Sequence, residues 1–212
     1  MVNKNIIVID KLQKDQKFSV GKNENKTFVI ILATDEVQNG DVKIIIEGEK
    51  AKVQILGMII GYGKQKIELY TLQDHLKPES VSDLFIKSVL FDEAKFNYKG
   101  LIKIEKDAQK SNAYQKNQNL LLSKNAWADS RPYLEILAND VRCTHGATVG
   151  KIDKDQLYYL QTRGLTQNMA THLIVEGFYL ELLERIPDVK IREELSKKLS
   201  KKIQFLLSRK IN

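Results

Sequence analysis

Residues 82–104 read SDLFIKSVLFDEAKFNYKGLIKI, a stretch in which apolar and polar side chains alternate. The apolar members of the pattern are Leu84, Ile86, Phe96, Tyr98 and the run from Leu101 to Ile104. A period of two places such side chains on one face of a β-strand. The stretch therefore predicts short β-strands joined by tight connections.

The same pattern extends over roughly the first 150 residues. Further apolar runs lie at residues 28–32, 42–46, 53–55 and 67–69, and turn-forming residues separate them, as in NG at 39–40, EGEK at 47–50 and GYGK at 61–64. Helical periodicity is absent, so this half is expected to be all-β, and either a β-sandwich or a β-solenoid would fit. Many of these apolar runs end at a charged or small residue, after which a new run begins, as in the coils of a parallel β-helix. This favours the solenoid.

After Gly150 the apolar period changes to the 3.6 residues of a helix. Asp153 can cap a first helix, with Gln156 at the capping-box position and Gly164 as its stop. We therefore expect a β domain at residues 1–150 and a small helical domain at residues 151–212.

Two further helices are expected in the second domain. Thr166 can cap one that ends at Pro187, and its expected apolar face is Met169, Leu173, Gly177 and Leu180. Asp188 can open the last helix, whose apolar side chains recur at steps of four opposite lysines: Ile191, Leu195, Leu199, Ile203 and Leu207. The ordinary use of such a stripe is packing inside the chain, and the alternative is a docking surface. The last stripe is the docking candidate, because nothing follows it in the sequence to cover it.

The composition describes an ordinary folded protein of 212 residues, with 42% hydrophobic and 29% charged residues. A single cysteine excludes an internal disulfide, and neither a signal sequence nor a membrane-spanning run is apparent, so we expect a cytoplasmic protein. The net charge of +7 comes from lysines scattered along the chain without interleaved aromatic residues. This favours a solvated surface over nucleic-acid binding.

The usual catalytic signatures are missing, so we do not expect an enzyme. The sequence has no phosphate-binding glycine loop, no G-x-S-x-G elbow and no zinc motif. It also lacks the acidic pairs or hexapeptide repeats of enzymes that act on carbohydrate or acyl groups. His75 has no partner nearby in the sequence, and neither it nor His172 is assigned a role.

One pair of side chains could carry chemistry. Cys143 and His145 lie two residues apart in DVRCTHGATVG, residues 140–150, and in an extended strand they would point to the same face. A thiolate and an imidazole suit iron, zinc or a transient sulfur species. The structural alternative is equally simple, since cysteine behaves as a small hydrophobe and the histidine could be hydrogen-bonded inside. Two ligands cannot complete a four-ligand site, so a metal role needs a second chain.

The chain resembles the SufB/SufD family of iron–sulfur cluster assembly proteins, and the SufD branch in particular. The likeness covers residues 70–186 and rests on an ordered series: DHL at 74–76, the stretch at 82–104, AYQKNQNLLLS at 113–123, RPYLEILANDVRCTHGATVG at 131–150 and DQLYYLQTRGL at 155–165. The SufB branch has a cysteine before its F-P-Y segment and a glutamate after the histidine. Here the corresponding segment at 123–136 has no cysteine and the second position is Gly146, which indicates the SufD side.

The resemblance implies a right-handed parallel β-helix followed by C-terminal helices that dock a SufC-like ABC ATPase. It implies pairing through the β-helix with a SufB-like subunit. Because the chain is short, a second copy of itself is another candidate partner. The family's functional histidine maps onto His145 and the neighbouring cysteine onto Cys143, which would handle transient iron or a nascent iron–sulfur cluster. This chain would bind no nucleotide. The competing hypothesis is a β-solenoid interaction module without metal chemistry.

Overall fold

The computed structural model describes residues 5–209. Within them the chain forms eleven strands followed by three helices. The strands are β1 (Ile6–Ile9), β2 (Gln16–Val20), β3 (Asn25–Leu32), β4 (Asn39–Ile46), β5 (Lys52–Gly61), β6 (Lys66–His75), β7 (Val81–Leu90), β8 (Lys95–Ile104), β9 (Asn112–Leu121), β10 (Trp127–Ile136) and β11 (Arg142–Lys151). The helices are α1 (Lys154–Thr162), α2 (Gln167–Leu183) and α3 (Val189–Ser208).

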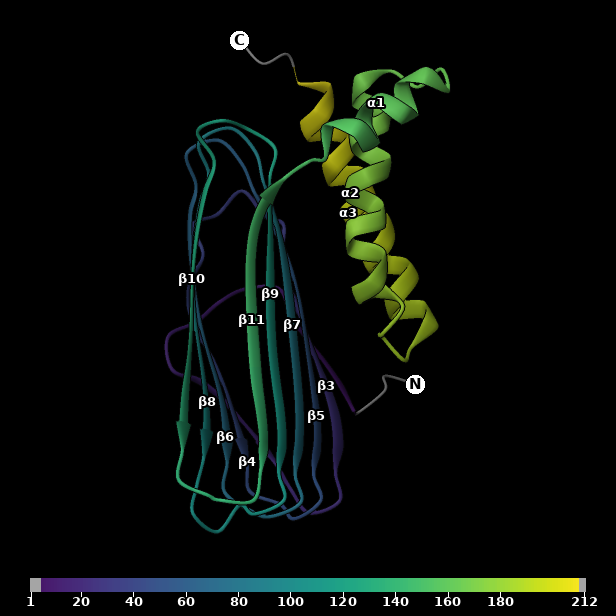
Figure 1. Cartoon of the computed structure of the whole chain (residues 1–212). Coiled ribbons are helices and arrows are strands. Elements are labelled where there is room, and N and C mark those ends of the chain that lie inside the picture. Colours follow the sequence, from purple (N-terminus) through teal and green to yellow (C-terminus); the bar gives the residue numbers. More distant parts are fainter. Residues whose placement is uncertain (1–4, 210–212) are drawn as a thin grey trace.

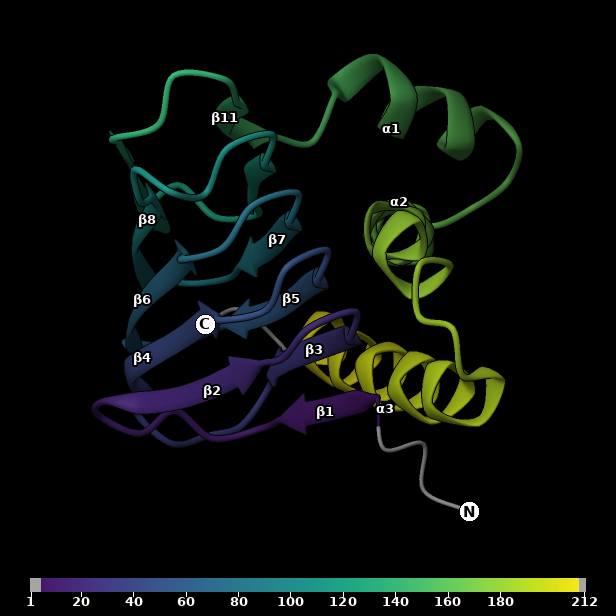
Figure 2. The ribbon, with the colours of Figure 1, turned by 90° about the horizontal axis from the view of Figure 1, so that it is seen from below.

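The strands form two parallel sheets between which the chain alternates. One sheet has the order β1-β3-β5-β7-β9-β11 and the other the order β10-β8-β6-β4-β2. Each consecutive pair of strands is therefore one coil, and the coils stack in sequence order (Figure 2). This confirms the predicted parallel β-helix. It excludes the sandwich, whose sheets would be antiparallel.

The interior of the β-helix is built by stacking the inward side chains of successive coils. Phe28, Ile55 and Leu84 occupy one register on β3, β5 and β7, and all three are fully buried. Burying a side chain of this size contributes about 1.5–3 kcal/mol, so each coil is stabilised mainly by the coil beneath it. A charged residue at Ile55 would break the stack, because a buried unpaired charge is strongly destabilising.

The six-stranded sheet is also apolar on its outer face. Residues 56–60 on β5, LGMII, are buried on both faces of the strand, which explains a continuous apolar run where alternation was expected. The helices α2 and α3 cover this face (Figures 1 and 2). The cover is a second apolar cluster in which Leu56, Met58 and Phe85 of the sheet pack with Val175 and Tyr179 of α2.

The predicted helix ends are confirmed by their caps. The side chain of Asp153 accepts hydrogen bonds from the backbone N–H groups of Asp155 and Gln156. Thr166 and Asp188 cap α2 and α3 in the same way. Gly164 has φ +90°, a conformation that suits glycine and turns the chain from α1 into α2. That residues 1–150 and 151–212 are separate domains stays a prediction.

The predicted apolar face of α2 is the exposed one. Met169, Leu173 and Leu180 are each 51–55% exposed, whereas Val175 and Tyr179 are buried against the sheet. The prediction was wrong because α2 is apolar on nearly all sides, so its own pattern does not choose the packed face. Contact with the sheet determines which face of α2 is buried. On that face the Tyr179 hydroxyl donates a 2.6 Å hydrogen bond to the backbone carbonyl of Ile59.

The apolar stripe of α3 packs inside the chain. Leu195, Leu199 and Ile203 are at most 5% exposed, and Ile191 and Leu207 are partly buried against the same cluster. The reason given for docking, that no later segment could cover the stripe, therefore fails, because earlier strands cover it. Contact of Leu195, Leu199 and Ile203 with a partner would require α3 to leave the β-helix, and a docking role of the stripe stays a prediction.

Charged residues fix the other end of α2 to the sheet. Lys87 is 3% exposed, and its Nζ donates to the backbone carbonyl of Phe178 at 2.6 Å and to the Glu181 carboxylate at 2.7 Å. Arg185 binds Asp83 at 3.2 Å. Burial lowers the pKa of Lys87, and its pairing with Glu181 opposes that shift. The helices are thus held by apolar packing and by a salt bridge from the buried Lys87 to Glu181, which the sequence did not reveal.

His75 is a core residue of the β-helix. It is fully buried, and its two ring nitrogens lie 2.7 Å from the Ser80 hydroxyl and 2.8 Å from the Ser82 hydroxyl. The expectation that it had no partner nearby in sequence was wrong, since the turn after β6 returns both serines to it. Burial lowers the pKa of His75 to about 4.

The buried imidazole predicts a pH-dependent stability. The unfolded chain takes up a proton at His75 near pH 6.5, whereas the folded protein does so only near pH 4. This stabilisation is fully present above about pH 6.5 and is lost as the pH falls toward about 4, amounting to about 3 kcal/mol. We expect the difference in free energy of unfolding between the wild type and His75→Gln to shrink accordingly in urea titrations. An equal difference at neutral pH and at pH 4 would contradict the prediction.

Candidate functional site

The coil formed by β10 and β11, here called the last coil, leaves one end of the β-helix uncovered (Figure 1). Among the described residues no further strand pairs with the outer edge of either strand. Their backbone N–H and C=O groups along that edge are therefore free to pair with another chain. Most residues of β10 and β11 are exposed, whereas most residues of β7 and β8 are buried or half-buried.

The two ends of the β-helix differ. The edge strands at the other end, β1 and β2, have 4 and 5 residues, whereas β10 and β11 have 10 residues each. Short edges are a common protection against unwanted pairing, and long uncovered edges invite it. The last coil is therefore the end of the described β-helix that is better suited to pairing.

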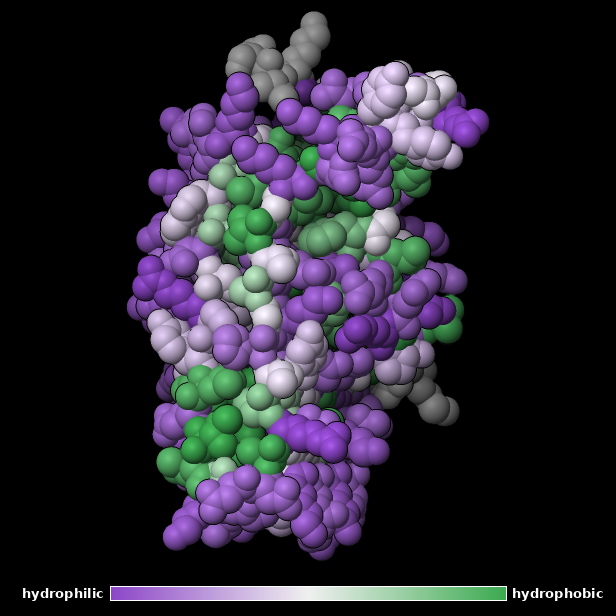
Figure 3. All heavy atoms as spheres, in the orientation of Figure 1, coloured by the Kyte–Doolittle hydropathy of each residue, from purple (hydrophilic) through white to green (hydrophobic). Residues whose placement is uncertain are grey.

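Apolar side chains accompany the free edges. Large hydrophobic residues at and after the end of β10 are 38–52% exposed: Tyr133, Leu134, Ile136 and Leu137. Figure 3 shows an apolar area low on this face, at the level where β10 ends in Figure 1. An apolar patch next to unpaired strand edges is typical of a protein interface.

Cys143 and His145 both lie on β11, in register with Ala113 and Gln115 of β9. Ala113 and Gln115 are interior residues, each 1% exposed, so the two side chains of β11 also face inward. The prediction that they share a face is confirmed. They differ in environment, because Cys143 is half-buried and His145 is exposed where no coil covers it.

Cys143 packs as a small hydrophobe. It lies against an apolar cluster that contains Ile102, Ile104, Ala113 and Ala138, with Val141 beside it. This burial raises the pKa of the thiol to about 11. The thiol is therefore protonated at neutral pH, while a metal ligand or nucleophile must be a thiolate.

The site is incomplete within one chain. In residues 5–209 no group of three or more His, Cys, Asp or Glu side chains could hold a metal ion. One exposed imidazole and one protonated thiol fit at most a part of an iron site, whose other ligands must come from elsewhere. The arrangement suits a shared interface.

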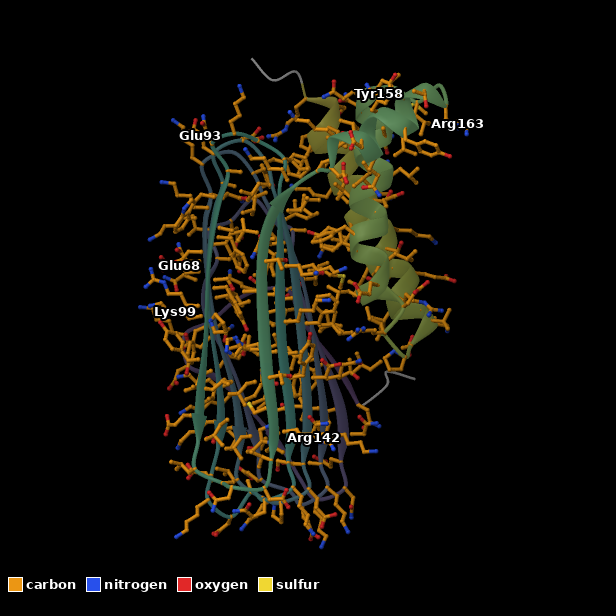
Figure 4. The ribbon with its side chains drawn as sticks, in the orientation of Figure 1. Glu68, Glu93, Lys99, Arg142, Tyr158 and Arg163 are labelled. Carbon is orange, nitrogen blue, oxygen red and sulfur yellow. The ribbon has the colours of Figure 1, made fainter. Side chains whose placement is uncertain are left out.

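A second exposed apolar surface lies on the helices. α1 has no buried residue, and its Tyr158 and Tyr159 are 69% and 56% exposed. On α2, Leu173 and Leu180 line a depression of about 300 Å³ between α2 and α3. Figure 4 shows Tyr158 near the opposite end of the molecule from Arg142, the first residue of β11. Sequence reasoning missed this surface because it took Met169, Leu173 and Leu180 as the packed face of α2 and preferred the last helix for docking.

None of the helices in the part of the chain described is long and apolar enough to cross a membrane.

Comparison with known proteins matches residues 13–178 to the family model "SUF system FeS cluster assembly, SufBD core domain". The chain belongs to the SufBD family. Within this family it is SufD-like, being 32% identical over 158 residues to the iron-sulfur cluster assembly protein SufD of Escherichia coli K12. That alignment covers 74% of this chain and 37% of the relative. The family match begins at residue 13, so it includes the segment before residue 70 that the sequence motifs left out.

Two other SufD proteins are similar. The Bacillus subtilis protein is 32% identical over 147 residues, which are 69% of this chain and 34% of the relative. The Plasmodium berghei protein is 30% identical over 183 residues, which are 85% of this chain and 14% of the relative. This SufBD chain thus spans little more than a third of the E. coli and B. subtilis relatives and less of the P. berghei protein.

The environment of Cys143 predicts a slow thiol. With its pKa raised from 9.0 to about 11, Cys143 carries about 100-fold less thiolate at neutral pH than an ordinary thiol. A more basic thiolate is also more nucleophilic, so we expect iodoacetamide to alkylate the folded chain about tenfold more slowly than the urea-unfolded chain, as followed by mass spectrometry. Similar rates in the two states would show that the thiol is not desolvated.

Proposed function

We propose that this chain is a non-catalytic scaffold subunit of a SUF-type iron–sulfur cluster assembly complex. The observation that carries the proposal is an exposed inward-facing histidine, His145, on the unpaired last coil of a SufBD-family β-helix. The chain pairs through this coil with a SufB-like subunit or with a second copy of itself. The nascent cluster is the cargo of the pair, and this chain binds no nucleotide.

Pairing is supported by what it would bury. Two uncovered strands of 10 residues offer rows of backbone donors and acceptors, and strand addition to such an edge is a common mode of recognition. The exposed apolar side chains near the end of β10 would be buried on pairing, and a stable interface has such an apolar centre.

In the proposed pair, His145 is the iron ligand of this chain and Cys143 is a packing residue beside it. A neutral imidazole is a good ligand for iron, and its exposure lets it meet ligands of the partner. The thiol of Cys143 becomes a ligand only if the partner places a positive charge or iron next to it, which would lower its pKa.

The C-terminal helices dock a SufC-like ABC ATPase. We place the contact on the exposed surface of α1 and α2, which includes Tyr158, Leu173 and Leu180, because the α3 stripe is occupied by the sheet. Exposed tyrosines and leucines next to a groove are typical of interface anchors.

The metal role predicts an order of effects. His145→Ala should lower the iron retained by the purified pair by about tenfold or more, because one ligand of the shared site is lost. Cys143→Ser should have a smaller effect, because the thiol is packed and protonated. Iron content and cluster formation measured after co-expression with the partner would test this. His172→Ala, on α2, is the matched control, and unchanged iron content in both site variants would exclude the metal role.

The docking surface predicts a second set of variants. Tyr158→Glu and Leu173→Glu should each weaken capture of the ATPase subunit by about tenfold or more, because a charge replaces an exposed apolar contact. The thermal stability of the chain should be unchanged, since both side chains are exposed. Val37→Glu, at a 72% exposed position outside the helices, is the control for surface charge. Undiminished co-purification of the ATPase subunit with both variants would show that the docking site lies elsewhere.

A β-solenoid interaction module without metal chemistry is the second candidate. It is favoured by the protonated, packed Cys143 and by the missing third ligand within the described chain. In that case pairing would persist while both site variants retain the same iron as the wild type.

A further inference from the structure

A cavity lies at the corner where the helices meet one end of the β-helix. It has a volume of about 420 Å³ and is bounded by the turns after β7 and β9, the starts of α1 and α2, and the end of α3. Figure 1 shows this corner at the top of the view, where α1 and the C-terminal end of α3 approach the turns of the β-helix. Ligand cavities in proteins measure about 300–1,000 Å³. The cavity is therefore large enough for a small organic molecule.

Part of the lining is apolar. These side chains come from the β-helix and from the helices: Phe91, Leu122, Ile152, Leu157, Leu206 and Leu207. Phe91 and Leu206 are at most 5% exposed, and the other four are partly buried. Apolar walls of this kind bury the hydrocarbon part of a ligand and supply most of its affinity.

Cationic side chains line the same cavity: Lys124, Lys151, Lys154 and Arg209. The lysines come from the turn after β9, the end of β11 and the start of α1, and none of them forms an ion pair with another of residues 5–209. Asp92 is the one carboxylate in the lining. Four cations and one carboxylate leave an excess of three positive charges, which attracts an anion.

Arg209 is held in place with one donor unused. Its Nη2 donates to the Asp92 carboxylate at 2.8 Å, and its guanidinium carbon lies 5.2 Å from the centroid of the Tyr62 ring. Its Nε is buried and has no hydrogen-bond partner. A buried donor without an acceptor destabilises the folded state, so it needs an explanation. An anionic oxygen in the cavity would supply the missing acceptor.

Neutral donors lie beside the cations. Thr171 of α2 lines the cavity and is 9% exposed, and its hydroxyl makes no hydrogen bond with the rest of the described chain. The Ser123 hydroxyl accepts from the backbone N–H of Asp92 at 2.8 Å, so its own hydrogen is available to a ligand. Gln167 and Asn168, the first residues of α2, also line the cavity. The positive end of a helix dipole adds to the attraction for an anion.

The depression on the outer face of the five-stranded sheet lacks this charge excess. Among its lining residues, Lys66 lies 2.5 Å from Glu68 and Arg131 lies 2.7 Å from Asp129, so these charges neutralise one another. A solvated surface would explain the three lysines of the corner cavity. It would not explain the buried, unpaired Nε of Arg209 beside them.

We propose that the corner cavity binds a small phosphate ester whose organic part is apolar. The phosphate lies among Lys124, Lys154 and Arg209, where it accepts hydrogen bonds from the ammonium groups and from the unused guanidinium nitrogen. A phosphate ester carries close to two negative charges and so matches the charge excess better than a carboxylate does. The organic part lies against Leu122 and Ile152. This inference is independent of the proposed scaffold function.

Titration of the full chain with phenyl phosphate, followed by ¹H–¹⁵N NMR, tests the inference. The backbone signals of Leu122, Ile152 and Thr171 should shift together, because these residues are distant in the sequence and line one cavity. Inorganic phosphate lacks the ring and benzyl alcohol lacks the charge, so each should bind about tenfold more weakly than phenyl phosphate. Benzoate, which has a single charge, should also bind more weakly.

Variants of the cationic residues test the phosphate end. Lys124→Gln and Lys154→Gln should each weaken phenyl phosphate binding by about tenfold, because each removes a charged donor. Both lysines are exposed, so the fold should be unchanged. Arg209→Lys keeps the charge and removes Nε, and it should weaken binding as well. Lys77→Gln is the matched control, since Lys77 is exposed in the turn between β6 and β7, at the other end of the strands, and its loss should leave the affinity unchanged.

Three results would overturn the inference. Shifts spread over lysines outside the cavity, with equal affinities in Lys154→Gln and Lys77→Gln, would show unspecific attraction to a basic surface. Inorganic phosphate binding as tightly as phenyl phosphate would exclude the apolar part of the ligand. Benzoate binding as tightly as phenyl phosphate would exclude the preference for a phosphate.

Discussion

The register between successive coils is the constraint on which the rest of this structure depends. Each inward side chain lies on the one before it and is covered by the one after it, so burial in a β-helix is always supplied by the neighbouring coil. The last coil has a coil beneath it and none above it among the described residues. Its backbone edges, its apolar side chains and His145 are left uncovered for the same reason, which is why one region combines a candidate interface with a candidate ligand.

The outer face of the six-stranded sheet imposes the second constraint. Its strands are apolar on both sides near β5, so the sheet needs a cover, and α2 and α3 supply it with Tyr179 and the Leu195–Ile203 stripe. This use of the inner faces leaves the opposite face of α2 and most of α1 exposed. The proposed ATPase contact is thus determined indirectly by the core of the β-helix.

The chemistry of the site depends on how deeply each of its side chains is buried in the β-helix. Cys143 reaches the apolar cluster of the coils beneath and stays protonated, while His145 lies two residues further along β11 and remains exposed. The same strand therefore carries a packing residue and a candidate ligand.

The sequence by itself determined the repeated strands, the change to helices after Gly150, the helix caps and the family, because alternation, periodicity and capping are local properties of the chain. It also placed Cys143 and His145 on one face of a strand. It did not decide which face of α2 would be buried, since this helix offers apolar residues on nearly all sides and only the outer face of the sheet selects among them. Nor did it reveal the hydrogen bonds of His75 or the burial of Lys87. These depend on which residues of different coils share a register, and only the tertiary structure brings them together.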